Sequence, residues 1–415
     1  MYRLEFIFKF IAILFLLSWH SLVFAKDDTE LPLVLLNTTE VRTEYFILST
    51  REFGLPPEPF GRGGSILALD KAIIYGSASG IFYKINTSNY NIEANYLPKL
   101  NTGANFLASS KRITFKELSP RVLDIIYENG FYFVTYERYD PKEDAVRFVI
   151  SKIKKTDKNW TDIYQSPKLD VTYFAMGDGG KMAFKQDKLF FTVGDFSLDR
   201  INNLPSDVAP QNKNLPWGKI NYIDLKDMSF HNYSLGHRNP KGLLFLKDGR
   251  LLSSENGPQG GDEINLIQKG KNYGWPYESY GTLYGAGFGR YKDALPQPNN
   301  GIYKSSIINS VNASLTKFGL IAPERSPYEA PIFAFIPSIS PTALVQIKDF
   351  DMNWDDDLLL GSLRAMSLFH IKLIGDRVVY SEPILLGKRI RDLKQGDKNF
   401  ILLTDDNSLM IVEKK

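Results

Sequence analysis

Two polar loops flank a predicted β-hairpin in residues 242–254 and carry groups suited to binding charged ligands. The loop before the hairpin contains Arg238 and Asn239, a fixed cation beside an amide. The loop after it contains Asp262 and Glu263 in a glycine-rich stretch of backbone. Because a hairpin brings its two ends together, both loops emerge at one end of the strand pair. Together they predict a binding site for an anion and for a hard metal ion.

This hairpin is one of six strand-turn-strand patterns along the chain. Each joins two runs rich in Val, Ile, Leu, Phe and Tyr through a joint rich in Gly, Asn, Asp and Pro. They recur roughly fifty to sixty residues apart, apart from one long insertion, as four-stranded propeller blades do. We therefore predict an all-β fold, a six-bladed β-propeller of four-stranded antiparallel blades, built on Ser65–Ile85, Val122–Tyr136, Lys181–Val193, Gly242–Ser254, Leu344–Ile371 and Asp392–Val412.

Ring closure and one insertion complete the predicted organisation. The early strand Glu40–Leu48 is predicted to join the last blade and so close the ring. Residues 281–328 are rich in Gly, Pro, Tyr, Asn and Ser, which predicts a long loop or a small hairpin over one face. Residues 26–415 are predicted to form a single propeller domain, and the alternative is a β-sandwich with a second domain.

The start of the chain has the features of a targeting segment. In Met1–Ala25, two basic residues accompany an apolar run that ends in a small-residue cleavage pattern, which is typical of a signal peptide. This predicts a periplasmic or secreted protein. An uncleaved N-terminal membrane anchor is the alternative.

Composition narrows the chemistry. The chain has no cysteine, which excludes disulfides, zinc–thiolate sites and iron–sulfur clusters. The formal net charge of +3 is close to neutral and the basic residues are not clustered, so no nucleic-acid partner is expected.

The stretch Ser234–Pro276 resembles the soluble quinoprotein sugar dehydrogenases, also called the glucose/sorbosone dehydrogenase family. The motifs that carry the resemblance are Gly-His-Arg-Asn-Pro at 236–240, Gly-Pro at 257–258 and Asn-Tyr-Gly-Trp-Pro at 272–276. The resemblance implies a six-bladed propeller that binds pyrroloquinoline quinone (PQQ) and calcium. It also implies oxidation of an aldose or related sugar, with electrons passed to a respiratory acceptor.

The resemblance assigns a set of cofactor-binding residues. PQQ is a quinone that carries carboxylates, and guanidinium groups bind carboxylates bidentately, so arginines are expected around it. Taken singly, each such arginine would be a solvated surface residue. Several fall at the ends of separate repeats, however, and these ends converge in a propeller. The implied set is Arg238, Asn239, Ser338, Arg364, Arg389 and Arg391, with Arg364 in the place of a family lysine.

Two calcium sites are implied in the same way. The quinone-bound ion, which would act as a Lewis acid, takes the backbone carbonyls of Gly257 and Pro258. A second ion takes Asp262, Glu263 and the carbonyl of Tyr273. The alternative for the acidic pair is a solvated turn.

Oxidation of a sugar C1 by hydride transfer also requires a base for the hydroxyl proton. The family has a histidine three residues before a Gly-Arg or Gly-Lys pair. Here that pair is Gly180-Lys181, and the corresponding position is Gly177. Asp178 is the nearest replacement and would need a raised pKa, while the alternative is an ordinary turn aspartate. The remaining motif histidine, His237, is expected to be structural.

The missing histidine leaves other functions open. One is a catalytically inactive, calcium-stabilised propeller that binds a carbohydrate or a protein. Another is an enzyme with different chemistry, such as a propeller lactonase.

Overall fold

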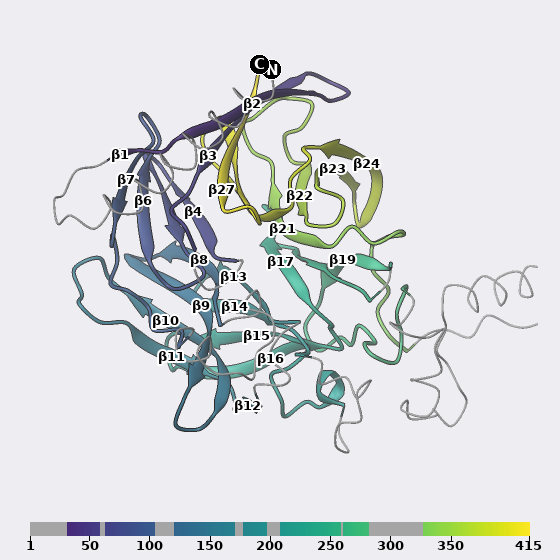
Figure 1. Cartoon of the computed structure of the whole chain (residues 1–415). Helices are drawn as coiled ribbons and strands as arrows, with labels where there is room; N and C mark the ends of the chain where they lie inside the picture. Colours follow the sequence, from purple (N-terminus) through teal and green to yellow (C-terminus); the bar gives the residue numbers. More distant parts are fainter. Residues whose placement is uncertain are drawn as a thin grey trace, which may run out of the picture.

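Six antiparallel sheets are arranged around a common axis in the computed structural model (Figure 1). It describes residues 31–58, 63–103, 120–170, 177–196, 208–258, 260–281 and 327–415. The predicted six-bladed propeller is therefore confirmed. Within these ranges the only helix is a 3₁₀ turn, Ala209–Gln211. No helix in the described residues has the length and apolar character needed to cross a membrane. The predicted signal peptide and nearly all of the predicted insertion, 282–326, lie outside the described residues.

Blades 1 to 3 each place their first strand at the axis and their later strands progressively outward. Blade 1 consists of β4 (Ser65–Leu69), β5 (Ala72–Gly76), β6 (Phe82–Asn86), β7 (Asn91–Ala94) and an added outer strand, β1 (Leu31–Pro32). Blade 2 consists of β8 (Val122–Glu128), β9 (Phe131–Asp140), β10 (Ala145–Ile153) and β11 (Thr161–Gln165), and β12 (Leu169–Asp170) also pairs with β10. Blade 3 consists of β13 (Gly179–Lys185), β14 (Lys188–Val193), β15 (Lys219–Asp224) and β16 (Ser229–Leu235).

Blades 4 to 6 follow the same order from the axis outward. Blade 4 consists of β17 (Pro240–Phe245), β18 (Leu251–Glu255), β19 (Asp262–Ile267) and β20 (Phe333–Phe335). Blade 5 consists of β21 (Pro341–Gln346), β22 (Leu358–Ser362), β23 (Ser367–Ile374) and β24 (Arg377–Leu385). Blade 6 consists of β25 (Ile390–Gln395), β26 (Asn399–Thr404), β27 (Ser408–Lys414), β3 (Ile47–Gly54) and β2 (Leu35–Arg42).

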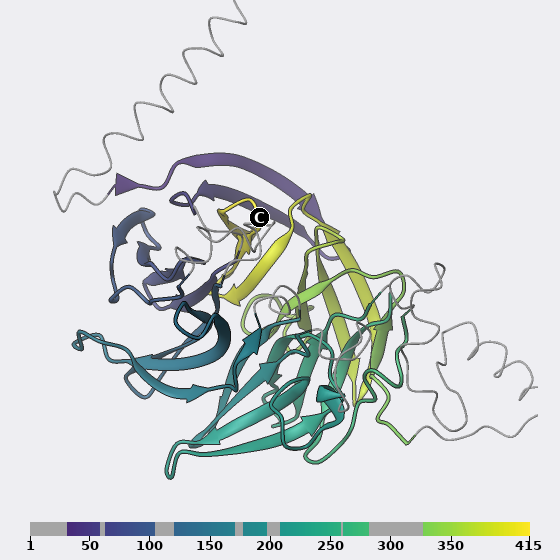
Figure 2. The ribbon, with the colours of Figure 1, turned by 60° about the horizontal axis from the view of Figure 1, so that its bottom comes forward.

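The ring is closed by an early strand that pairs with the last one. β3 pairs antiparallel with β27, so the two ends of the propeller are held in one sheet. β2 then adds a fifth strand, which curves along the outer edge of blade 6 (Figure 2). The prediction that an early strand joins the last blade is confirmed, but the predicted bounds of that strand were wrong. The closing strand is Ile47–Gly54, and Glu40–Leu48 spans the end of β2, the turn and the start of β3.

The hydrophobic core consists of six clusters, one between each pair of neighbouring blades. Between blades 5 and 6, for example, Trp354 is fully buried and stacks on Phe350, which contacts Phe400. Apolar sheet faces packed in this way exclude water along every blade contact. The inner strands β4, β8, β13, β17, β21 and β25 contact one another in a closed circuit around the axis.

A buried ion-pair cluster joins four blades at the axis. Lys181 Nζ of β13 lies 3.0 Å from Asp124 Oδ1 of β8 and 2.7 Å from Asp392 Oδ1 of β25. Ser65 of β4 donates to both carboxylates, and Lys394 Nζ lies 3.3 Å from Asp124 Oδ1. Because both carboxylates are buried, their shared ammonium is what makes the charges tolerable there.

Hydroxyl groups make further hydrogen bonds between neighbouring blades. In each case a Thr or Ser donates to a backbone carbonyl at the inner strand of the next blade. The bonds are Thr135 Oγ1 to Gly180 O, Thr192 Oγ1 to Pro240 O, Ser254 Oγ to Thr342 O, and Thr342 Oγ1 to Ile390 O. These bonds fix the starts of the inner strands relative to one another.

We expect Lys181→Met to lower the free energy of unfolding by about 3–5 kcal/mol, because it leaves the buried Asp124 and Asp392 with only the more distant, partly exposed Lys394 as a cation. Thermal unfolding followed by circular dichroism measures the change. Lys226→Met is the matched control, since the side chain of Lys226 is 74% exposed and its solvated ion pair with Asp187 should contribute little to stability. Equal effects of the two substitutions would contradict this account.

Stability should also fall in acid through the same cluster. Burial raises the pKa of Asp392, but Lys181 and Lys394 outweigh burial and lower it to about 2 from the ordinary 3.8. The folded state therefore binds fewer protons than the unfolded state between these values. The stability that Asp392 contributes is fully present above its ordinary pKa of 3.8 and is lost as the pH falls through the lowered pKa of about 2. Asp392→Asn should abolish this part of the acid dependence, which is measured by unfolding at a series of pH values.

Candidate active site

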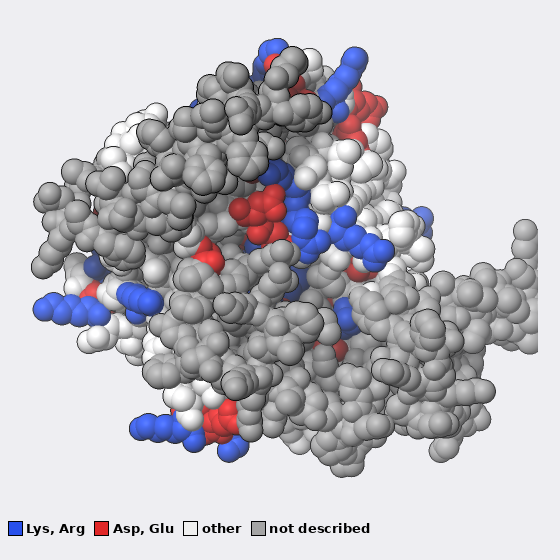
Figure 3. Space-filling model, viewed as in Figure 1, with Lys and Arg blue, Asp and Glu red and all other residues white. Residues whose placement is uncertain are grey.

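The starts of the inner strands meet at one end of the ring, which we call the mouth. It is defined by Arg121, Asp178, Lys241, Arg389, Arg391 and Asp405, which come from blades 2, 3, 4 and 6. Figure 3 shows basic and acidic side chains gathered near the centre of one face. Arg389 and Arg391 come from the same blade and share one partner, Asp405. The expectation that arginines of separate repeats converge on the cofactor stays a prediction.

Asp178 is the buried anion of the mouth. Arg121 Nη2 donates to its Oδ2 at 2.8 Å, and Lys241 Nζ donates to its Oδ1. The side chain is only 3% exposed. Burial raises the pKa of Asp178, but Lys241 and Arg121 outweigh burial and hold it well below its usual range. The raised pKa expected of a catalytic base at Asp178 is therefore wrong, because two cations stabilise the carboxylate.

Asp405 anchors two arginines of blade 6. Arg389 Nε donates to Asp405 Oδ2 at 2.8 Å, and Arg391 Nε donates to Oδ1 at 2.7 Å. Asp405 is nearly fully buried, whereas the side chains of Arg389 and Arg391 are 42% and 17% exposed. One carboxylate therefore orients two guanidinium groups without neutralising both, and a net positive charge remains for an anionic ligand.

Arg238 lies over the loop that was predicted to bind calcium. Its Nη1 donates to Asn256 O at 2.9 Å and to Gly257 O at 2.8 Å, and its guanidinium carbon lies 5.5 Å from the centre of the Trp275 ring. A cation thus already occupies the carbonyl of Gly257. Asn239 Oδ1 accepts from Gly179 N at 3.1 Å, which ties blade 4 to the start of blade 3.

Asp262 is committed to holding the loops of blade 4. Its Oδ1 accepts from Gly257 N at 2.9 Å. Its Oδ2 accepts from Ser338 Oγ at 2.8 Å, Ile339 N at 2.7 Å and Ser340 N at 2.8 Å. Four donors leave this carboxylate few lone pairs for a metal ion. Ser338, predicted to contact the cofactor, is engaged in the same set of bonds.

Glu263 lies beside a second carboxylate. Asn265 Nδ2 donates to Glu263 Oε2 at 3.0 Å and lies 3.5 Å from Glu255 Oε2. Burial and the charge of Glu255 raise the pKa of Glu263 to about 8. Asn265 Oδ1 is buried and has no hydrogen-bond partner among the described residues. These oxygens have the chemistry that a calcium ion takes, in a position with excess negative charge.

His237 has a structural position, as expected. It is fully buried, its Nδ1 lies 2.9 Å from Glu255 Oε2, and its Nε2 lies 2.9 Å from Ser234 Oγ. Its ring stacks on Tyr273 with centroids 4.6 Å apart. Arg364 is exposed, and no partner for its guanidinium lies among the described residues.

The two calcium sites differ in how well these residues fit them. No three His, Asp or Glu side chains in the described part of the chain converge closely enough to hold a metal ion. The site at Gly257 and Pro258 does not fit as arranged, because Arg238 holds Gly257 O. The surroundings of Glu263 do fit a cation. The assigned calcium ligands, including Asp262 and the carbonyl of Tyr273, stay predictions.

Three residues of the mouth, and one buried carboxyl group near it, were missed by sequence reasoning. Arg121 and Lys241 pair with Asp178, and Asp405 pairs with the arginines of blade 6. Glu137 of β9 is 1% exposed nearby, and burial followed by the charge of Asp178 raises its pKa well above its usual range. Lys241 stands directly beyond the Gly-His-Arg-Asn-Pro motif, which is the one signal that could have pointed to it.

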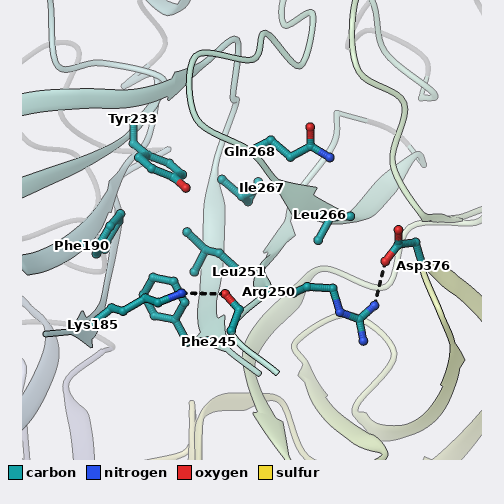
Figure 4. A pocket seen from close by; sticks show the side chains of 11 residues that line it. Lys185, Phe190, Tyr233, Phe245, Arg250, Leu251, Leu266, Ile267, Gln268 and Asp376 are labelled. Atoms are coloured by element: carbon teal, nitrogen blue, oxygen red, sulfur yellow. Dashed lines mark hydrogen bonds and ion pairs between the residues drawn. The ribbon is translucent and has the colours of Figure 1, made fainter. Parts of the chain in front are cut away.

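A separate pocket of about 320 Å³ lies at the other end of the β17–β18 hairpin (Figure 4). Its walls include the aromatic rings of Phe190, Tyr233 and Phe245. Lys185 Nζ donates to Gly249 O at 2.9 Å, and Arg250 Nη1 lies 2.7 Å from Asp376 Oδ1. Both cations already have protein partners, so this pocket lacks the surplus charge found at the mouth.

Comparison with known proteins identifies the family. The sequence pattern of the family described as "Glucose / Sorbosone dehydrogenase" matches residues 124–317 and 305–412. This chain belongs to the glucose/sorbosone dehydrogenase family. The predicted resemblance is thereby confirmed: the family is one of sugar dehydrogenases.

Individual relatives match parts of the chain. The aldose sugar dehydrogenase YliI of Escherichia coli is 31% identical over 182 residues, which are 42% of this chain and 41% of that protein. Quinoprotein glucose dehydrogenase B of Acinetobacter calcoaceticus is 31% identical over 166 residues, 34% of this chain and 35% of that protein. The matched segments thus span less than half of these two relatives.

A solved structure shows the same fold. The apo-form of the soluble aldose sugar dehydrogenase of Escherichia coli superimposes with a TM-score of 0.65 at 20% sequence identity, covering 88% of this chain and 100% of that one.

We expect millimolar calcium to stabilise the protein through Glu263 above about pH 8, where Glu263 is ionised, because a cation would relieve its repulsion with the buried carboxylate of Glu255. The melting temperature should rise by a few degrees when calcium is added and fall back to its starting value when a chelator removes the ion. Glu263→Gln should remove that rise and should be at least as stable as the unsubstituted chain in chelator. Glu329→Gln, at an exposed pair with Lys271, is the control and should keep the full response. A calcium response that survives Glu263→Gln would place the ion elsewhere.

Proposed function

We propose that this protein is a PQQ-dependent dehydrogenase of an aldose or a related sugar. The observation that carries the proposal is the cationic mouth, where Arg389 and Arg391 share the buried Asp405. Arg121 and Lys241 share Asp178, so the cations outnumber the carboxylates here too. A planar polycarboxylate supplies the negative charge that this arrangement lacks.

The residues assigned to the cofactor fit that chemistry. Arg389 and Arg391 would bind its carboxylates, with their orientation fixed by Asp405. The exposed Arg364 and the side chain of Asn239 lie on neighbouring blades, and Arg238 approaches from the loop of blade 4. When bound, PQQ supplies a quinone that accepts two electrons and a hydrogen from a carbinol. The protein would orient the sugar and remove its hydroxyl proton.

Calcium belongs to the proposal in a limited way. The surroundings of Glu263 support a stabilising ion, whereas Arg238 on Gly257 O does not favour an ion bound to the quinone. We therefore derive no step through calcium. Export to the periplasm or the medium, and transfer of electrons to a respiratory acceptor, are also part of the proposal. The N-terminal residue of the mature protein, determined by mass spectrometry, tests the cleavage after Ala25.

A direct test combines a binding titration with a turnover assay. Purified protein should bind PQQ with a change in the visible absorption of the quinone. The loaded protein should reduce an artificial dye when aldoses are added. Absence of quinone binding, or absence of turnover across a broad sugar panel, would contradict the proposal.

A second function is favoured by one observation, the strongly stabilised carboxylate of Asp178. A propeller without a competent base would bind PQQ or a carbohydrate without turning it over. Quinone binding with no dye reduction at any pH from neutral to alkaline would support this inactive binding module.

We expect Arg391→Met and Asp405→Asn each to weaken PQQ binding by about ten- to a hundredfold, because a charge-assisted hydrogen bond contributes about 1.5–3 kcal/mol. Asp405→Asn acts by releasing both guanidinium groups. Asp406→Asn is the matched control, because this neighbouring carboxylate is 56% exposed and pairs with Lys388 instead. Unchanged affinity in Asp405→Asn would exclude the blade 6 arginines from the cofactor site.

A further inference from the structure

The backbone at Gly177 is built for glycine. Its φ is +82°, a left-handed conformation that side chains rarely adopt. A Cβ added there would lie 2.5 Å from Asp195 Oδ1, and Asp195 is held by a bond from Trp275 Nε1 at 2.8 Å. No histidine fits at this position without rearrangement. A proton acceptor for a carbinol must therefore come from another residue of the mouth.

Asp178 and Arg121 do not meet this need. Asp178 is kept ionised by its two cations, and its lowered pKa makes it a poor proton acceptor near neutral pH. The guanidinium of Arg121 does not lose its proton in proteins, and its pKa is raised further beside Asp178. Of the three groups in this buried set, only the amine of Lys241 can change its protonation near neutral pH.

Lys241 is placed where a substrate hydroxyl could reach it. It lies two residues after Asn239, at the start of β17, and the side chains of both residues bind the backbone of Gly179. Its Nζ donates to Asp178 Oδ1 and to Gly179 O, the latter at 3.1 Å, while Asn239 Oδ1 binds Gly179 N. Its side chain is 14% exposed, compared with 3% for Asp178. Lys241 thus borders both the assigned quinone contact and the position of the missing histidine.

The charges around Lys241 prepare its amine for proton transfer. Burial lowers the pKa of Lys241, Asp178 opposes this, and the cations Arg121 and Arg391 lower it further, to about 8. Glu137 lies in the same electrostatic set, but it is 1% exposed and its Oε1 has no hydrogen-bond partner among the described residues. Glu137 is therefore less accessible to a sugar than Lys241, whose side chain is 14% exposed.

We propose that Nζ of Lys241 accepts the hydroxyl proton of the sugar, with Asp178 as the residue that positions it. This inference rests on the proposed function. The neutral amine of Lys241 would take the hydroxyl proton and become an ammonium, and the substrate would leave as a carbonyl product. PQQ, when bound, would supply the two-electron oxidant that accepts the hydride from the carbinol carbon. Asp178 stabilises the ammonium and holds it beside Gly179.

The pH profile and two substitutions test the role in turnover. The rate constant kcat/KM for dye reduction should rise with pH and level off above about 8, as the free amine forms. Lys241→Met and Lys241→Arg should each lower kcat by about 10²- to 10⁴-fold. Lys241→Arg keeps the positive charge beside Asp178 and so guards against loss of folding. In Lys241→Arg, which retains the charge, PQQ affinity measured by absorbance should change less than about tenfold.

A measurement without cofactor tests the amine itself. The side-chain nitrogens of ¹⁵N-lysine-labelled whole protein can be titrated by NMR, and the signal missing in Lys241→Arg is that of Lys241. We expect it to titrate near pH 8 and to move to lower pH in Asp178→Asn, since the charge that favours the ammonium is removed. Titration of Lys241 in the ordinary lysine range would overturn the proposal.

The remaining outcomes separate this inference from the proposed function. Normal kcat but lost quinone affinity in Lys241→Met would make Lys241 a cofactor-binding cation and overturn its role as acceptor. Glu137→Gln should keep most of the activity; a loss there with activity retained in Lys241→Met would make Glu137 the acceptor. If the unsubstituted protein oxidises no sugar, the proposed function fails as well, whereas turnover that survives loss of Lys241 defeats only this inference.

Discussion

Lys181 lies between two buried aspartates at the axis, and this ion pair sets the geometry of the propeller centre. Asp124, Lys181 and Asp392 come from three different blades, and Ser65 adds a fourth. A buried carboxylate without a partner is costly, so the inner strands must meet where the ammonium can serve both. The apolar clusters between blades supply most of the driving force for closure, but they do not by themselves fix how the blade starts are aligned.

Buried carboxylates are paired with cations at the mouth as well. Asp178 binds cations from blades 2 and 4, and Asp405 binds both blade 6 arginines. Each carboxylate is buried and each cation is partly exposed. The protein thus keeps its negative charges inside and presents positive charge to a ligand, which suits recognition of a polycarboxylate by preoriented guanidinium groups. The excess of cations also lowers the pKa of Lys241, so binding and proton transfer would depend on one charge distribution.

Much of this organisation was predictable from local patterns. All six predicted hairpins correspond to inner strands and their partners, because strand alternation and turn residues act over short stretches of chain. The family was predictable from the dense motifs at 236–276, and it is confirmed. The closing strand was placed several residues too early, since nothing local distinguishes the two strands β2 and β3 of one hairpin.

The charge partners of the site were decided by the tertiary structure alone. A catalytic base at Asp178 would need a raised pKa, but Lys241 and Arg121 outweigh burial and lower the pKa of this carboxyl group. These two cations lie 63 and 57 residues away in the chain. Arg238 was assigned to the quinone, yet its guanidinium also holds the carbonyl assigned to calcium. The repeating strands, the ring that they form and the residue types at their ends were predictable from the sequence, because these follow from local periodicity and composition. Which cation neutralises which carboxylate depends on distances between blades, and those distances exist only once the ring has closed.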